Sequence, residues 1–247
     1  TIFQTKRKNL EGIIPATFPL NPENISYMTT SQKVFIDTFL KMENARIIPV
    51  TARDREQYNR TFLSKEPRVK DVAMYFSAVI TENGEIDQKW ENHIKSSYKK
   101  LKFPLDKMWS LINKNISHDI FKMALVENFY IVIKNRLKGS ENYIAQNEGL
   151  LPVLRNFLED EYFIHYNDNN IALIPHFIDK RFAVEYFVDK YKPELTIGAG
   201  DSLTDLNFMQ SCDFKIIPKH SQIAKSLLNK NHLSLFPLPE TLISKRS

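Results

Sequence analysis

The stretch IGAGDSLTDLNFM, residues 197–209, is the most informative segment of the chain for its fold. An apolar run ends in Gly-Ala-Gly, and two carboxylates follow, Asp201 and Asp205. The run is typical of a buried strand in a parallel sheet, and residues four apart share one face of a helix. Carboxylates at such a position suit Mg²⁺, which also takes water and phosphate oxygens as ligands. The alternative is that both carboxylates only cap the following helix.

Composition limits the class of protein. The 247 residues, 43% of them hydrophobic, are enough for one large domain or two modest ones. The only cysteine, Cys212, excludes an internal disulfide and a cysteine-based metal site. A lone thiol suits a reducing compartment, and residues 1–12 lack the apolar core of a signal peptide. We therefore expect a cytoplasmic protein. No membrane partner is expected, since no apolar run reaches the roughly 18 residues of a spanning helix.

The charge balance is basic, with 34 Lys and Arg against 29 Asp and Glu, for a net charge of +5. Such an excess can attract nucleic acid or anionic ligands. The basic residues are interleaved with acidic ones, however, and the densest cluster, residues 95–103, is typical of an exposed helix face. The signature of a nucleic-acid-binding module is absent. The sequence therefore predicts no specific nucleic-acid partner.

Strand-like and helical segments alternate towards both ends of the chain. Such alternation predicts a parallel sheet with helices on both faces. The expected strands cover residues 10–17, 45–52, 195–200 and 213–218, and the expected helices include 30–42 and 179–191.

The middle of the chain has a different pattern. Asn83-Gly84 is a turn signal, long polar helices follow, and residues 167–170 separate two strand-like runs as in a hairpin. We therefore predict an α/β fold, with a Rossmann-like parallel-sheet core and an inserted α+β cap domain. The predicted core comprises residues 1–81 and 179–247, and the predicted cap comprises residues 82–178.

Three further residues are candidates for binding phosphate. Thr51 follows a buried apolar run, where a hydroxyl and backbone N–H groups can bind a phosphate oxygen; the alternative is a helix N-cap. Arg53 belongs to the same predicted phosphate-binding set. Lys180 begins a predicted helix, where a cation opposes the helix dipole, so it is a candidate for neutralising a phosphate; the alternative is a solvated lysine. Because parallel strands present their carboxyl ends at one edge, we expect these residues to converge there with Asp201 and Asp205.

Four segments together resemble the haloacid dehalogenase (HAD) superfamily, in the order of its motifs. PVTAR (49–53) resembles the second motif, DKRFAV (179–184) the third, and GAGDSLTDLNFM (198–209) the fourth. AVITENG (78–84) resembles the strand and turn that lead into the cap of the large-cap subgroup. Phosphatases of the sucrose-phosphatase and mannosyl-3-phosphoglycerate phosphatase kind belong to that subgroup.

The resemblance assigns a role to each matching residue. It implies that Thr51 is the phosphate-binding hydroxyl and that Lys180 stabilises the charge of the phosphate. It also implies that Asp201 and Asp205 are the carboxylates on the metal side. The activity implied is Mg²⁺-dependent phosphate transfer from a small phosphorylated metabolite.

The first motif of the superfamily, Asp-x-Asp-x-Thr, has no counterpart. The best register within GIIPATFPLNP (12–22) places Pro15 at the nucleophile and Thr17 at the general acid and base, and this stretch contains no Asp or Glu. Asp37 lies in the middle of a predicted helix, and Asp54 would approach from another strand. The metal side of the predicted site is thus present, and the nucleophile is missing.

Three hypotheses follow for function. The one we favour is a HAD-like pseudoenzyme, a degenerate phosphatase that serves as a binding or regulatory subunit for a phosphorylated small molecule, a protein partner or a second copy of itself. The second is an active Mg²⁺-dependent phosphatase acting on a sugar phosphate or a similar metabolite. The third is another enzyme class on the same scaffold, such as a transferase. Loss of the first Asp also removes a metal ligand, so we expect Mg²⁺ to bind weakly or not at all.

Overall fold

The structure is a computed structural model that describes most of the chain. The described residues are 12–18, 25–158, 160–167, 169–219 and 221–227. Contacts divide the chain into two compact units, which are described separately below. The first unit comprises residues 1–45, 60–62 and 184–247, and the second comprises residues 46–59 and 63–183. The division into a core and a cap of residues 82–178 stays a prediction.

The N-terminal strand of the first unit is short and antiparallel. Of the predicted strand 10–17, β1 covers Ile13–Pro15, and residues 10 and 11 lie outside the described residues. β1 pairs with β2 (Tyr27–Thr29), a strand that the sequence did not predict. The chain folds back because the Ala16 N–H donates to the Ser26 carbonyl at 2.8 Å. A parallel pairing of this segment was therefore the wrong expectation for the described residues.

Helix α1 (Thr30–Lys41) follows directly and confirms the helix predicted there. Its N-cap is Thr29, whose hydroxyl oxygen accepts the Gln32 N–H at 3.1 Å, while the Gln32 side-chain oxygen accepts the Thr29 N–H at 2.8 Å. This reciprocal capping box satisfies two N–H groups that a helix start otherwise leaves without acceptors. Ile36 is the buried residue of α1.

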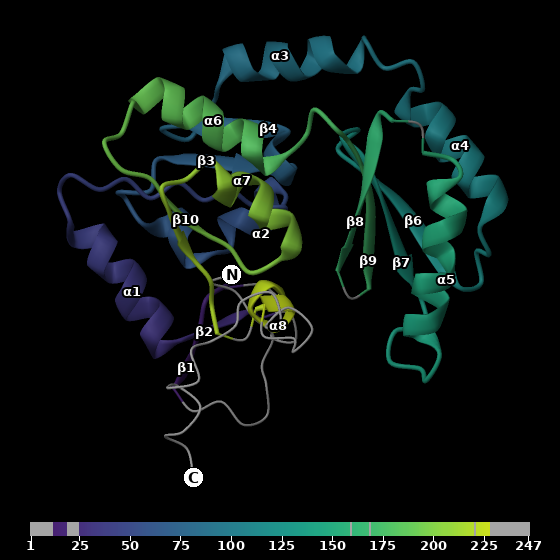
Figure 1. Cartoon of the computed structure of the whole chain (residues 1–247), viewed down its shortest axis with the longest axis horizontal. Coiled ribbons are helices and arrows are strands. Elements are labelled where there is room, and N and C mark those ends of the chain that lie inside the picture. The colour runs from purple at the N-terminus through teal and green to yellow at the C-terminus, as the bar shows by residue number, and fades with distance from the viewer. Residues whose placement is uncertain (1–11, 19–24, 159, 168, 220, 228–247) are drawn as a thin grey trace, which may run out of the picture. The chain divides into compact units, whose positions relative to one another are not determined.

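The C-terminal part of the first unit holds the predicted parallel strands. β10 (Ile197–Ala199) and β11 (Phe214–Ile216) pair in parallel, and α7 (Leu206–Gln210) connects them after a 3₁₀ turn (Figure 1). Helix α6 (Lys180–Tyr191) precedes β10, and α8 (Gln222–Leu227) follows β11. The alternation predicted here is confirmed. Its small core consists of Phe208, Met209, Cys212 and Ile223, with Val184, Leu206 and Ile217 against them.

The second unit begins with an antiparallel sheet. β3 (Asp71–Met74) pairs with β4 (Val79–Glu82), and β4 pairs with β5 (Glu85–Ile86). The β4–β5 turn is at the predicted Asn83-Gly84, where both residues are left-handed, with φ of 51° and 85°. Such angles are typical of a tight hairpin turn.

The predicted strand 45–52 forms only a parallel bridge from Val50 to Ala73. The Ala73 N–H donates to the Pro49 carbonyl, and the Thr51 N–H donates to the Ala73 carbonyl, both at 2.9 Å. A full strand was therefore the wrong expectation. The apolar run predicted a buried strand, but within the described residues its pairing with β3 is limited to these two backbone hydrogen bonds.

A four-stranded antiparallel sheet and two helices complete the second unit. The strand order is β6 (Phe121–Val126), β7 (Tyr130–Asn135), β9 (Asn170–Pro175) and β8 (Tyr162–Asn167). Helices α4 (Leu105–Asn115) and α5 (Tyr143–Arg155) pack along one face of the sheet (Figure 1). Helix α3 (Gln88–Tyr98) contacts β4 instead. The buried core between helices and sheet includes Met108, Ile112, Leu154, Ile131, Ile133 and Leu173.

Within the described residues, every helix is too short or too polar to cross a bilayer.

Candidate functional site

The loop after β10 carries the two carboxylates of the predicted metal side. Asp205 is buried, with 5% of its surface exposed. Its Oδ2 accepts the N–H groups of Asp201 and Ser202, each at 3.0 Å. The Asp201 carbonyl accepts the Ile223 N–H at 3.2 Å. Asp205 therefore holds its own loop closed, and Asp201 is fixed through its backbone on both sides.

Two glycines allow the strand and loop to approach closely. A Cβ at Gly200 would lie 2.5 Å from the Asp205 Cβ and 2.7 Å from the Met209 Sδ. A Cβ at Gly198 would lie 3.0 Å from the Cys212 Sγ. Neither glycine has the left-handed backbone that sharp turns require. Close packing, and not a left-handed turn, is what these positions need glycine for.

Thr51 lies at the end of the Val50 bridge in the second unit. Its Oγ1 accepts the Arg53 N–H at 3.1 Å, and its carbonyl accepts the Phe76 N–H at 3.0 Å. A hydroxyl that accepts through a lone pair keeps its proton for donation. Thr51 can therefore donate to an anionic oxygen while its loop stays folded.

The segment that holds the Thr51 carbonyl is strained. Tyr75, Phe76 and Ser77 are buried, and all are left-handed, with φ of 53°, 57° and 92°. Each such residue costs on the order of 1 kcal/mol or more, and persists where its surroundings fix it. Besides the bond from Phe76 to Thr51, two more hydrogen bonds help to fix this segment. The Tyr75 N–H donates to the Arg53 carbonyl at 3.0 Å, and the Trp90 Nε1–H donates to the Ser77 carbonyl at 2.8 Å.

Phe76 lies between the Thr51 segment and Lys180. The Lys180 Nζ lies 5.8 Å from the centre of the Phe76 ring, within the range of a cation–π contact. From the four-stranded sheet, the rings of Tyr130 and His165 lie 5.5 and 4.9 Å from the same ring. The Tyr130 hydroxyl donates to the Ala52 carbonyl at 3.4 Å, and burial raises the Tyr130 pKa, with smaller contributions from Asp54 and Tyr75.

Pro15 and Thr17 are the residues that align with the two carboxylates of the missing first motif. Pro15 is exposed and lies opposite Tyr27 in the β1–β2 pair. Thr17 is 3% exposed, and its Oγ1 accepts the Ser26 N–H at 2.8 Å. Thr17 also bridges to Thr61. Neither position supplies a carboxylate.

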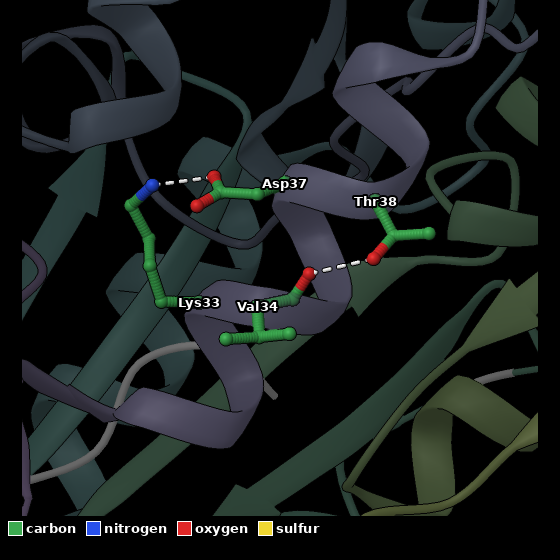
Figure 2. A network of polar contacts seen from close by, with 4 residues as sticks. All are labelled: Lys33, Val34, Asp37 and Thr38. Atoms are coloured by element: carbon green, nitrogen blue, oxygen red, sulfur yellow. Dashed lines mark hydrogen bonds and ion pairs between the residues drawn. The ribbon is translucent and has the colours of Figure 1, made fainter.

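Asp37 and Asp54, the first two aspartates along the chain after residues 12–22, have other partners. Asp37 forms an ion pair with Lys33 one turn earlier in α1, as Figure 2 shows. Asp54 precedes α2 (Arg55–Asn59), and its Oδ1 accepts the Gln57 N–H at 2.6 Å. Asp37 thus belongs to the side of a helix and Asp54 to a helix cap, as expected for residues outside a first-strand motif.

Comparisons with known proteins decide the fold. No protein family profile and no curated protein matches the sequence. Among solved structures, the sucrose-phosphatase of Synechocystis in complex with sucrose and phosphate is similar at 15% identity and a TM-score of 0.54, covering 77% of this chain and 75% of that chain. A Thermoplasma acidophilum protein is similar at 14% identity and a TM-score of 0.56, covering 86% and 85%. The C-terminal domain of the C. albicans trehalose-6-phosphate phosphatase is similar at 13% identity and a TM-score of 0.50, covering 79% and 69%.

The chain has a HAD-like fold. The predicted α/β fold class is thereby confirmed. Sequence identities this low show only that the fold is shared. The roles of individual residues in this HAD fold are therefore argued from the contacts that each residue makes.

The predicted site residues of the HAD fold are divided between the two units. Thr51, Arg53 and Lys180 lie in the second unit, and Pro15, Thr17, Asp201 and Asp205 lie in the first. Phe76 connects Thr51 and Lys180 within their unit. The convergence of both groups at one edge stays a prediction.

The predicted metal side has one carboxylate oxygen already engaged. One oxygen of Asp205 already accepts two backbone N–H groups, and the positions of Pro15 and Thr17 add no carboxylate. Over the described ranges, no group of three His, Cys, Asp or Glu side chains is placed to hold a metal ion. Weak binding of Mg²⁺ through Asp201 stays a prediction.

Sequence reasoning missed three residues of the site: Phe76, Tyr130 and His165. Aromatic residues at their spacing indicate a core, and nothing local marks Phe76 as left-handed. The only available signal was position, since Phe76 lies two residues before the segment AVITENG.

Proposed function

We propose that this chain binds a phosphorylated small molecule and does not hydrolyse it, serving as a binding or regulatory subunit. The observation that carries this proposal is the absence of any Asp or Glu from residues 12–22, where the resemblance to the HAD superfamily places the nucleophile. The similar structures support the ligand class, because one contains sucrose with phosphate and another belongs to a trehalose-6-phosphate phosphatase. A sugar phosphate is therefore the first ligand to test.

The chain's own residues explain how it binds a phosphate without hydrolysing it. The Thr51 hydroxyl donates to a phosphate oxygen, with Arg53 in the same loop, and the Lys180 ammonium offsets the phosphate charge. Hydrolysis through an aspartyl-phosphate needs a side chain that attacks phosphorus. Pro15 has no such group, and the Thr17 hydroxyl is buried against the Ser26 N–H. Where Mg²⁺ binds, it supplies charge neutralisation of the phosphate.

Hydrolysis is the first test. Purified protein with Mg²⁺ should release no phosphate from trehalose 6-phosphate or 4-nitrophenyl phosphate beyond the rate of Asp201→Asn. The double variant Pro15→Asp, Thr17→Asp restores both missing carboxylates, and Pro15→Asn, Thr17→Asn is the matched uncharged control. Turnover by the unaltered protein that needs Mg²⁺ and disappears in Asp201→Asn would replace this proposal by an active phosphatase.

Binding is the second test, followed through backbone amide signals in NMR titrations with trehalose 6-phosphate and with inorganic phosphate. Signals near Thr51 and those of the loop 200–205 should shift together if the two groups of residues form one site. Lys180→Ala should weaken binding by about tenfold, which equals 1.4 kcal/mol. Lys190→Ala removes an exposed lysine from the same helix and should leave the affinity unchanged. Equal effects of both variants would refute the assignment of Lys180.

A further inference from the structure

A cavity of about 430 Å³ lies on one face of the β3–β4 hairpin. Val72 lies opposite Thr81 in the register of the two strands, so both point to the same face, and Met74 follows two residues on. All three are at most 5% exposed and line the cavity. The cavity therefore has a mainly apolar floor with one hydroxyl.

The wall formed by α2 contributes a buried phenol. Tyr58 is 7% exposed and lines the cavity. Burial raises its pKa to about 12, so the hydroxyl is protonated and able to donate at neutral pH. Among the described residues, none forms a hydrogen bond with this hydroxyl. Asn59, also in α2, and Ser64, in the following 3₁₀ turn, add further polar groups to the lining.

The rim of the cavity is positively charged. Arg55, Lys65 and Lys70 line it, and among the residues that the structure describes Glu66 is the only acidic one that does so. No ion pair joins any of these three cations to another residue in the described part of the chain. Three cations and one carboxylate around the cavity leave a net positive charge that favours an anion.

We propose that this cavity binds a small anion with an apolar body, such as an aromatic or short alkyl phosphate, phosphonate or carboxylate. The apolar part would lie on Val72 and Met74, and the anionic group would lie at the rim near Lys65 and Lys70. The volume is within the roughly 300–1,000 Å³ of small-molecule sites. Thr51, Arg53 and Lys180 do not line this cavity, so the site is separate from the one in the proposed function.

Phenylphosphonate is the probe of choice, because it combines one ring with an anionic group that a phosphatase cannot hydrolyse. Calorimetry should show binding, and amide signals of residues 58–59 and 64–70 should shift in NMR spectra. Inorganic phosphate should bind at least about tenfold more weakly, since it lacks the ring that covers the apolar floor. Benzoate shows whether a carboxylate suffices as the anionic group.

Charge reversal provides the decisive comparison. Lys65→Glu, Lys70→Glu should weaken phenylphosphonate binding by about tenfold or more. Lys107→Glu, Lys114→Glu on the exposed side of α4 makes the same change of net charge away from the cavity, and should leave binding unchanged. Thermal unfolding of both variants verifies that they fold.

Three results would overturn the proposal. One is the absence of phenylphosphonate binding, and another is equal loss in the two charge-reversal variants. The third is loss of binding in Lys180→Ala, which would assign the anion to the other site. Tyr58→Phe keeps the ring and removes the hydroxyl, so unchanged affinity in that variant would remove Tyr58 from the proposal.

Discussion

Replacing Gly200 by alanine tests whether close packing defines the loop that carries Asp201 and Asp205. The new methyl group would lie 2.5 Å from the Asp205 Cβ and 2.7 Å from the Met209 Sδ. Both distances are far below van der Waals contact, and Asp205 cannot move without releasing the N–H groups of Asp201 and Ser202. The substitution should therefore disturb packing and loop hydrogen bonds together.

The expected magnitude follows from opposing effects. Overpacking a dense site costs about 1–3 kcal/mol, while Gly→Ala reduces the entropy of the unfolded chain by about 0.4–1 kcal/mol. Gly200→Ala should thus destabilise the protein by about 1–2 kcal/mol. Gly198→Ala should cost less, because its closest neighbour is the Cys212 Sγ at 3.0 Å. Gly149→Ala, in the interior of α5 with nothing within 4 Å, should stabilise by roughly 0.5–1 kcal/mol.

Differential scanning calorimetry or far-UV circular dichroism is the appropriate assay. Tryptophan fluorescence would mislead, because Trp90 and Trp109 both lie in the second unit and Gly200 lies in the first. In a chain of this size, each kcal/mol changes the Tm by about 2–4 °C. A Gly200→Ala protein with an unchanged or higher Tm, or with the same Tm as Gly149→Ala, would refute the packing argument.

Three further predictions concern Asp205, Tyr58 in the cavity beside the β3–β4 hairpin, and Mg²⁺ binding at Asp201. Asp205→Ala leaves two loop N–H groups without their acceptor and should cost about 1–3 kcal/mol in thermal unfolding, whereas Asp205→Asn retains an acceptor and should cost less; equal losses would contradict this account. Stability should fall as the pH rises above 10, because native Tyr58, with its pKa raised to about 12, keeps a proton that the unfolded chain loses. Tyr58→Phe should make that fall in urea-unfolding midpoints smaller, and an unaltered slope would argue against it. Calorimetric titration should show no micromolar binding of Mg²⁺, and a crystal with octahedral Mg²⁺ on Asp201 at roughly 2.1 Å would show the opposite.

The sequence by itself determined the fold class and the positions of several elements. Helix α1, the β10–α7–β11 unit and the Asn83-Gly84 turn all lie where periodicity, capping and turn chemistry placed them. These signals are local, since each depends on residues within one or two turns of helix or one hairpin. The order of the motif residues, and the lack of a carboxylate in residues 12–22, are likewise properties of the sequence.

Tertiary structure alone decided what several residues do. Asp205 matches a metal-side carboxylate by sequence, and the folded loop turns one of its oxygens to two backbone N–H groups. The run 45–52 is apolar enough for a strand, yet its pairing with β3 is a single bridge at Val50. Phe76 contacts Lys180 and the Thr51 carbonyl from a left-handed backbone. The outcomes for Val50 and Phe76 depend on partners far away along the chain, and long-range contacts leave no periodic or spacing signal in the residues that make them. The Asp205 bonds are local, and the folded loop decides that its carboxylate meets these N–H groups.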